Sequence, residues 1–235
     1  MESLAINRSL STTARTAGFL YLIIITCGIF SEAFIRASLI VPGDASATAG
    51  NILAAPGLFR SGFAADSVML LCDVAIAVLF YVLLRPVSRT LALLAAAFRL
   101  IQAAILGFNL LNYYAALLLL TGAEYVAGFE NGQLHAQALL FLQLHSHGYD
   151  LGLMFFGLSN IFLGYLIIRS GYFPALLGYG LAAAAVVYLG GSYVRFLAPD
   201  FHAQVTPLYI IPLLAELGFC LWLVIKGVKV PQEAS

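Results

Sequence analysis

Six stretches of the 235-residue chain are each long and apolar enough to cross a lipid bilayer as a helix. A spanning helix needs about 20 mostly apolar residues to cover the hydrocarbon core. Because that core offers no water to the backbone, helices are the expected structure, and the continuous apolar runs lack the alternation of membrane β-strands. The sequence therefore predicts an all-α fold, a polytopic membrane bundle of six transmembrane helices. The predicted spans are residues 14–40, 63–85, 90–120, 148–169, 174–197 and 207–227.

Composition excludes several other classes of protein. Hydrophobic residues make up 62% of the chain and charged residues 9%, whereas soluble globular domains carry about 45–50% and about 25%. Such a chain is neither disordered nor a nucleic-acid binder with a basic patch. With 11 basic and 11 acidic residues the formal net charge is zero, so no overall field steers a charged partner. We expect a single integral membrane domain over residues 1–235.

Basic residues are distributed unequally between the two predicted sides of the membrane. If the N-terminus is inside, the inner segments carry seven Lys or Arg residues and the outer segments three. Because Lys and Arg are enriched on the cytoplasmic side, we expect both termini to be cytoplasmic and the protein to lie in the inner membrane. The inner residues are Arg8, Arg15, Arg85, Arg89, Arg169, Lys226 and Lys229, and the outer residues are Arg36, Arg60 and Arg195.

Polar residues inside the spans are the main candidates for function, because a charge at mid-membrane costs about 2.5–3.5 kcal/mol on insertion scales. Span 90–120 carries a polar stripe about 21 Å long, whose members fall within roughly 80° of one another on a helix. Its charged member lies near mid-depth and must face the bundle interior. The stripe consists of Arg99, Gln102, Asn109 and Tyr113.

The guanidinium of Arg99 requires a partner of opposite charge. Asp73 and Glu216 both lie near the middle of their spans, which predicts an ion pair of Arg99 with one carboxylate or both. Two carboxylates around one guanidinium leave a net negative charge unless they share a proton. The sequence leaves open whether this cluster is a permanent pair that fixes helix packing or a ligand or proton site.

Further charged residues lie near the outer ends of the spans. Glu32 and Arg36 have the spacing and order of a favourable i,i+4 ion pair. Asp66 lies seven residues before Asp73 and shares its helix face; it is also a candidate partner for Arg195. The predicted ligand-binding residues are therefore Arg99, Gln102, Asn109, Tyr113, Asp73, Asp66, Glu216, Glu32 and Arg36.

The segment QLHSHGYD raises the alternative of a metal site at His145, His147 and Asp150. The two histidines point about 200° apart on a helix, so they grip one metal ion only if the helix unwinds, which Gly148 could permit. Zinc needs three or four ligands, and no HExxH motif is present. Other segments would have to complete the site, and the competing interpretation is an interfacial polar cluster.

Several long blocks of sequence point to a known family. The chain resembles, over nearly its full length, a bacterial multi-pass membrane family catalogued as domain of unknown function 4386. The resemblance implies a helical membrane fold and a bacterial origin, and it carries no catalytic or binding residues across. It rests on the blocks TARTAGFLYLIIITCGIFSE, VPGDASATAGNILAAPGLFR, YVLLRPVSRTLALLAAAFRLIQAAILGFNLLN, FFGLSNIFLGYLIIRSGYFPALLGYG and AELGFCLWLVIKGV.

Three classes of function are compatible with these features. The first is a binder or carrier of a small or lipidic molecule, held in a polar cavity open to the outer leaflet with Arg99 on a polar or anionic head group. The second is an intramembrane enzyme that uses His145, His147 and Asp150 for acid–base or metal-assisted chemistry. The third is an accessory subunit of a membrane complex. Membrane lipid is the expected partner, and the sequence identifies neither a cofactor nor an oligomeric state.

Overall fold

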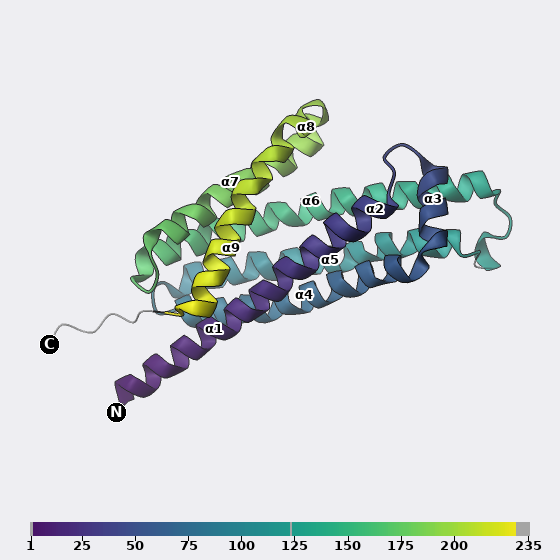
Figure 1. Ribbon diagram of the computed structural model, residues 1–235. Helices are drawn as coiled ribbons and strands as arrows, with labels where there is room; N and C mark the ends of the chain where they lie inside the picture. The colour runs from purple at the N-terminus through teal and green to yellow at the C-terminus, as the bar shows by residue number, and fades with distance from the viewer. Residues whose placement is uncertain (1, 123, 229–235) are drawn as a thin grey trace. The chain divides into compact units, whose positions relative to one another are not determined.

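The computed structural model describes residues 2–122 and 124–228, and these residues form helices and no strands (Figure 1). The predicted all-α fold is confirmed. Lys229, which enters the charge count above, lies outside the described residues. The α-helices are α1 (Glu2–Ile29), α2 (Ala37–Leu39), α3 (Ala45–Ala54), α4 (Pro56–Leu84), α5 (Arg89–Leu120), α6 (Asn131–Ser170), α7 (Ala175–Leu197), α8 (His202–Val205) and α9 (Ile210–Ile225). The segment Phe30–Arg36 is a π-helix, and Glu124–Val126, Pro199–Phe201 and Thr206–Tyr209 are short 3-10 helices.

Six helical stretches of the described chain are long and apolar enough to cross a membrane, as the sequence predicts. Glycines mark the ends of two of these helices. Gly122 follows α5 and Gly171 follows α6, and each has a positive φ, a backbone conformation that favours glycine. The six stretches are Leu10–Leu39, Pro56–Leu84, Arg89–Leu120, Asn131–Ser170, Ala175–Leu197 and Pro199–Ile225.

Three of the predicted spans begin clearly later than the helices in the structure. Helix α1 begins at Glu2 rather than near residue 14, α4 begins at Pro56 rather than near residue 63, and α6 begins at Asn131 rather than near residue 148. The start of α6 carries glutamines and histidines that interrupt its apolar run. Its helical signal is instead the four-residue spacing of Leu134, Ala138 and Leu142, all of which are buried.

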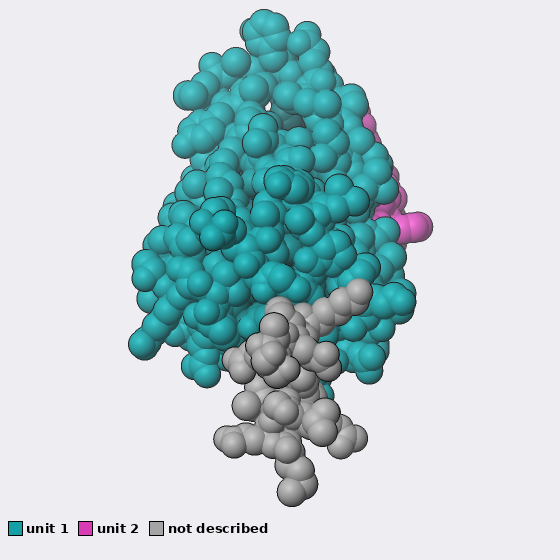
Figure 2. All heavy atoms as spheres, turned by 90° about the vertical axis from the view of Figure 1, so that its left-hand side faces the viewer, with its two compact units in different colours: residues 1–23, 72–103, 150–235 teal, residues 24–71, 104–149 magenta. Residues whose placement is uncertain are grey.

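The chain divides into two compact units (Figure 2). The unit boundaries fall inside α1, α4, α5 and α6, so each of these helices contributes a segment to both units. Unit 1 comprises residues 1–23, 72–103 and 150–235, and unit 2 comprises residues 24–71 and 104–149.

Small residues permit close helix packing within unit 1. Helix α7 packs against α9, and a Cβ atom on Gly180 of α7 would lie 3.3 Å from the Cβ of Ala215 of α9. Helix α7 also meets α6, where Gly178 and Gly164 bring the two backbones together. A third interhelical contact is the hydrogen bond that Ser159 of α6 donates to the carbonyl of Ala95 of α5, at 2.8 Å. Small residues and buried hydroxyl bonds of this kind are typical of helix contacts in membranes.

Unit 2 has an apolar core of its own in which helix α3 takes part. Asp44 caps the N-terminus of α3 by accepting a hydrogen bond from the amide of Ala47 at 2.8 Å. The rings of Phe59 and Tyr113 stack with centroids 4.0 Å apart. The buried core consists of Ile35, Leu39, Ile52, Phe59, Tyr113, Ala116, Leu117, Ala138 and Leu142.

Candidate functional site

Arg99 forms the predicted ion pair with Asp73 in unit 1. Its Nε donates to Oδ1 of Asp73 at 2.9 Å, and its Nη2 contacts the same oxygen. The second carboxylate oxygen accepts a hydrogen bond of 3.2 Å from the amide nitrogen of Gln102. All three side chains are buried, and Arg99 is only 1% exposed. The pairing of Arg99 with Asp73 is therefore confirmed.

Three aromatic rings surround the Arg99 guanidinium. Its Cζ lies 4.9 Å from the ring centroid of Phe156, 5.2 Å from that of Tyr21 and 5.9 Å from that of Phe80. A cation over an aromatic face is attracted by the ring quadrupole, most strongly where water is excluded. The rings and Asp73 together replace the hydration that Arg99 has in water.

Of the two carboxylates predicted as candidates, Asp73 and not Glu216 forms the ion pair with Arg99 in the described part of the chain. Glu216 accepts a hydrogen bond of 2.8 Å from the Tyr188 hydroxyl and one of 3.3 Å from the amide nitrogen of Asn160. No ion pair joins it to Arg99 among the described residues, although the two charges are close enough to act on each other. The name Arg99 cluster is used below for Tyr21, Asp73, Arg99, Gln102, Asn160, Tyr188 and Glu216.

Buried polar atoms without a hydrogen-bond partner are concentrated in the Arg99 cluster. Because carboxylates only accept, the amide nitrogens of Gln102 and Asn160 must face Asp73 and Glu216, which leaves both amide oxygens free. Almost all buried polar groups in proteins are hydrogen-bonded, and an unsatisfied one costs about 1–3 kcal/mol. The four unpartnered atoms are Tyr21 Oη, Arg99 Nη1, Gln102 Oε1 and Asn160 Oδ1.

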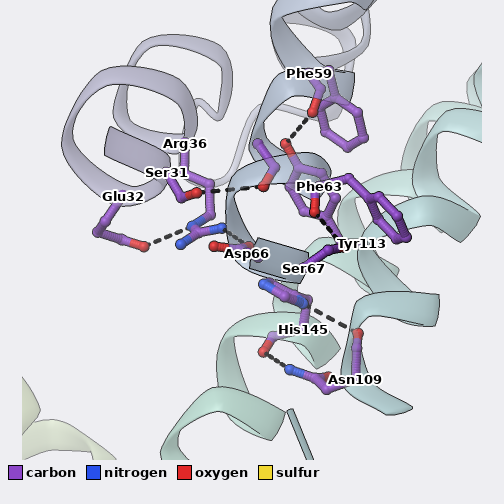
Figure 3. Close-up of polar contacts among 11 residues, drawn as sticks. Ser31, Glu32, Arg36, Phe59, Phe63, Asp66, Ser67, Asn109, Tyr113 and His145 are labelled. Carbon is purple, nitrogen blue, oxygen red and sulfur yellow. Dashed lines mark hydrogen bonds and ion pairs between the residues drawn. The ribbon is translucent and has the colours of Figure 1, made fainter. Parts of the chain in front are cut away.

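Unit 2 contains a second set of charges around Arg36 (Figure 3). Its Nε donates to Oε2 of Glu32 at 2.7 Å, and its Nη1 donates to Oδ2 of Asp66 at 2.7 Å. The predicted pair of Glu32 and Arg36 is confirmed. The pairing of Asp66 with Arg195 is wrong, because Asp66 binds Arg36 while Nη1 of Arg195 lies 2.8 Å from Oδ2 of Asp150.

Glu32 and Arg36 lie in the π-helix Phe30–Arg36. The amide of Ala37 donates to the carbonyl of Glu32, five residues earlier, instead of the four that an α-helix uses. Ser31, in the same segment, donates a hydrogen bond of 3.3 Å to the carbonyl of Gly62 on α4. Single π-helical turns occur frequently at functional sites. Here the turn brings both Ser31 and Arg36 to face α4.

Beside this set, α5 and α6 are joined by a reciprocal pair of hydrogen bonds (Figure 3). The amide nitrogen of Asn109 donates to the carbonyl of His145 at 2.7 Å, and Nδ1 of His145 lies 3.2 Å from the carbonyl of Asn109. A Cβ at Gly148 would overlap the Asn109 side chain. Gly148 therefore permits this close approach inside a continuous helix, and not the unwinding considered for a metal site.

The hydrogen bonding fixes the protonation of the neutral His145 ring. A carbonyl oxygen only accepts, so Nδ1 carries the hydrogen and Nε2 presents a lone pair. Nε2 is buried and has no partner, and the same is true of Oδ1 of Asp66. Arg36, Asp66 and Glu32 are close enough for their charges to act on the imidazole. The name Arg36 cluster is used below for Ser31, Glu32, Arg36, Asp66, Asn109, Tyr113 and His145.

The structure gives no support to a metal site at His145, His147 and Asp150. Nδ1 of His147 lies 2.8 Å from the carbonyl of Gln143 on its own helix, and Asp150 pairs with Arg195. Within residues 2–122 and 124–228, no group of three or more His, Cys, Asp or Glu residues could hold a metal ion.

The predicted ligand-binding residues thus fall into two sets. Asp73, Arg99, Gln102 and Glu216 lie in unit 1, and Glu32, Arg36, Asp66, Asn109 and Tyr113 lie in unit 2. The clusters also include five residues that were not predicted to bind a ligand, of which only His145 was a sequence candidate, as a metal ligand. They are Tyr21, Ser31, His145, Asn160 and Tyr188. The available signal for Tyr21 and Asn160 was their position inside apolar runs, where a polar group needs a partner.

The distribution of exposed side chains defines the class of protein. Phe108 is 76% exposed and Leu197 79%, whereas the charged side chain of Arg99 is buried. An exposed apolar surface around buried charges suits a lipid environment and not water. With six helices apolar enough to span a bilayer, the chain is a multi-pass helical membrane protein.

The chain belongs to the family described as Domain of unknown function (DUF4386), which matches residues 16–227. A relative from Archaeoglobus fulgidus, described as "Uncharacterized protein", is 32% identical over 167 residues, which cover 71% of this chain and 84% of the relative. No solved structure matches the chain.

Proposed function

We propose that this membrane protein binds a small polar molecule, or the polar head group of a lipidic molecule, at the Arg99 cluster. The observation that carries the proposal is the set of four unpartnered polar atoms in this buried cluster. A permanent ion pair alone accounts for Asp73 and two nitrogens of Arg99. It does not account for the remaining guanidinium nitrogen or for two free amide oxygens.

The unpartnered atoms define the chemistry of the ligand. Nη1 of Arg99 only donates, so it requires an acceptor such as a hydroxyl or carbonyl oxygen. The free oxygens of Gln102 and Asn160 require donors, and the hydroxyl of Tyr21 accommodates either. Because Asp73 already neutralises Arg99, an uncharged ligand with hydroxyl or amide groups fits better than a strong anion.

Apolar surroundings suit the rest of a lipidic ligand. Phe80, Phe219 and Tyr21 pack together with ring centroids 5.7–6.2 Å apart. Since the four polar atoms are buried, access to the site requires a local opening of the helices. The proposal retains the sequence-based orientation, with both termini cytoplasmic in the inner membrane.

Native mass spectrometry of the gently solubilised protein tests the proposal. We expect a stoichiometric organic mass above that of the bare chain. Gln102→Leu removes one of the free oxygens and is expected to abolish the added mass. The matched control is Gln143→Leu, the same change at an exposed position of α6, which should retain it. Retention of the added mass by Gln102→Leu, or a bare chain in the wild type, would contradict the proposal; circular dichroism and gel filtration establish that each variant folds.

A further inference from the structure

We propose a second site, in unit 2, at which Asp66 and His145 accept two hydrogen bonds from a primary ammonium group. The site uses the Arg36 cluster and none of the residues of the Arg99 cluster. It is therefore independent of the function proposed above.

Asp66 and His145 each have one buried lone pair without a partner, and the charge of Asp66 acts on the imidazole. Oδ2 of Asp66 is occupied by Arg36 and Nδ1 of His145 by the carbonyl of Asn109, which leaves Oδ1 and Nε2 free. Figure 3 shows the imidazole next to the Arg36–Asp66 pair. The two free atoms are not hydrogen-bonded to each other. Since both are acceptors, the group that satisfies them must carry at least two donor hydrogens.

The charges of the cluster favour a cation as that group. Glu32 and Asp66 contribute two negative charges and Arg36 one positive charge, which leaves one excess negative charge beside a neutral imidazole. The buried pair of Arg36 and Asp66 is neutral, and the excess charge lies on the exposed carboxylate of Glu32 at the edge of the cluster. A water molecule would satisfy the lone pairs, whereas an ammonium group satisfies them and is also attracted by this charge.

The donor set favours an organic cation over a metal ion. Among the described residues no third His, Cys, Asp or Glu joins Asp66 and His145 as a metal ligand. The surroundings are aromatic instead: the Tyr113 ring lies 5.3 Å from the imidazole, between centroids, and stacks on Phe59. Aromatic faces attract ammonium groups. Glu32, with its side chain 75% exposed, supplies a carboxylate at the surface that draws a cation toward the cluster.

The test uses the full chain labelled with ¹⁵N-histidine in phosphatidylcholine nanodiscs at constant pH, and follows the ring nitrogen signals by NMR. Methylammonium is expected to shift one Nε2 signal saturably, and His145→Gln should remove that signal. Tetramethylammonium has the same charge but no donor hydrogen, so it should leave the signal unchanged. Absence of a saturable shift, or an equal shift with tetramethylammonium, would overturn the proposal.

Two variants link the shift to the charges of the cluster. Asp66→Asn keeps the side-chain shape but removes one charge, and we expect methylammonium affinity to fall about tenfold or more. Glu32→Gln removes the charge of a side chain that is 75% exposed, and a fall of several-fold is expected. The matched control is Asp150→Asn in unit 1, another buried carboxylate paired with arginine. Equal weakening by Asp150→Asn would overturn the assignment to Asp66.

A primary ammonium group could come from a free amine or from an aminolipid head group. Replacing phosphatidylcholine with phosphatidylethanolamine in the nanodiscs distinguishes the two sources. If the bound state of the His145 signal appears without added methylammonium, the ligand is the lipid head group. If the signal responds only to added methylammonium, the ligand is a free amine.

Discussion

Replacement of Asp73 by alanine is expected to lower the free energy of unfolding by about 3–5 kcal/mol. The substitution leaves the guanidinium of Arg99 buried without the carboxylate that accepts two of its hydrogen bonds. The three aromatic rings remain, but a cation–π contact contributes only about 0.5–2 kcal/mol. Thermal or denaturant unfolding of the purified protein in detergent measures the loss.

Two further variants separate loss of the pair from loss of any carboxylate. Asp44→Ala removes the cap of α3, whose carboxylate accepts one amide hydrogen bond, and should cost about 0.5–2 kcal/mol. The double variant Asp73→Ala with Arg99→Met should recover much of the loss, because replacing both partners leaves no unpaired charge. An effect of Asp73→Ala no larger than that of Asp44→Ala would contradict the importance of the pair.

The second large effect is expected at the contact between α6 and α7. A Cβ atom on Gly178 would lie 2.5 Å from the carbonyl oxygen of Gly164 and 3.1 Å from the amide nitrogen of Ile168. Backbone atoms cannot rotate away, so the helices must separate. Gly178→Val is therefore expected to destabilise the protein by about 3 kcal/mol, at the upper end of overpacking costs, measured by thermal unfolding in detergent.

Gly190 supplies a control on the same helix. A Cβ at Gly190 meets no atom within 4 Å, so Gly190→Val leaves the helix contact intact. Valine also has a better helix propensity than glycine, and we expect little change or a small gain in stability. If both glycine variants lost the same stability, the close contact at Gly178 would not explain the result.

The six spans were predictable because hydropathy reports directly on burial in lipid. What hydropathy could not show is where a spanning helix continues as an amphipathic one. The first part of α6 is such a region. Leu134, Ala138 and Leu142 form its buried face, while the polar residues between them lower the hydropathy of the segment.

The depth of Arg99 in its span predicted an ion pair with Asp73, Glu216 or both, because a charge at mid-membrane must pair with another at the same level. Depth did not decide between these two carboxylates, and it did not predict the partner of Asp66. Helix periodicity places side chains on a face but does not say which neighbouring helix packs there, and a π-helical turn cannot be read from the sequence pattern. Arg36, and not Arg195, consequently reaches Asp66.

The polar stripe of α5 shows the same limit. Its four members share a face, as periodicity predicts. In the structure the stripe is divided at the unit boundary: Arg99 and Gln102 bind Asp73, whereas Asn109 and Tyr113 bind the carbonyls of His145 and Phe59. One face of one helix thus contributes to two separate clusters.

The π-helical turn at Phe30–Arg36 has a consequence for how related chains diverge. A π-turn accommodates one residue more than the α-helical turn it replaces, so a single deletion here restores a regular α-helix. In a regular α-helix, side chains five residues apart point about 140° apart, so Ser31 and Arg36 both face α4 only because this turn is wide. A deletion between them gives a four-residue spacing, which keeps two side chains on one face of an α-helix. Relatives that lack one residue between these two positions should therefore still carry an acidic residue at the position of Asp66.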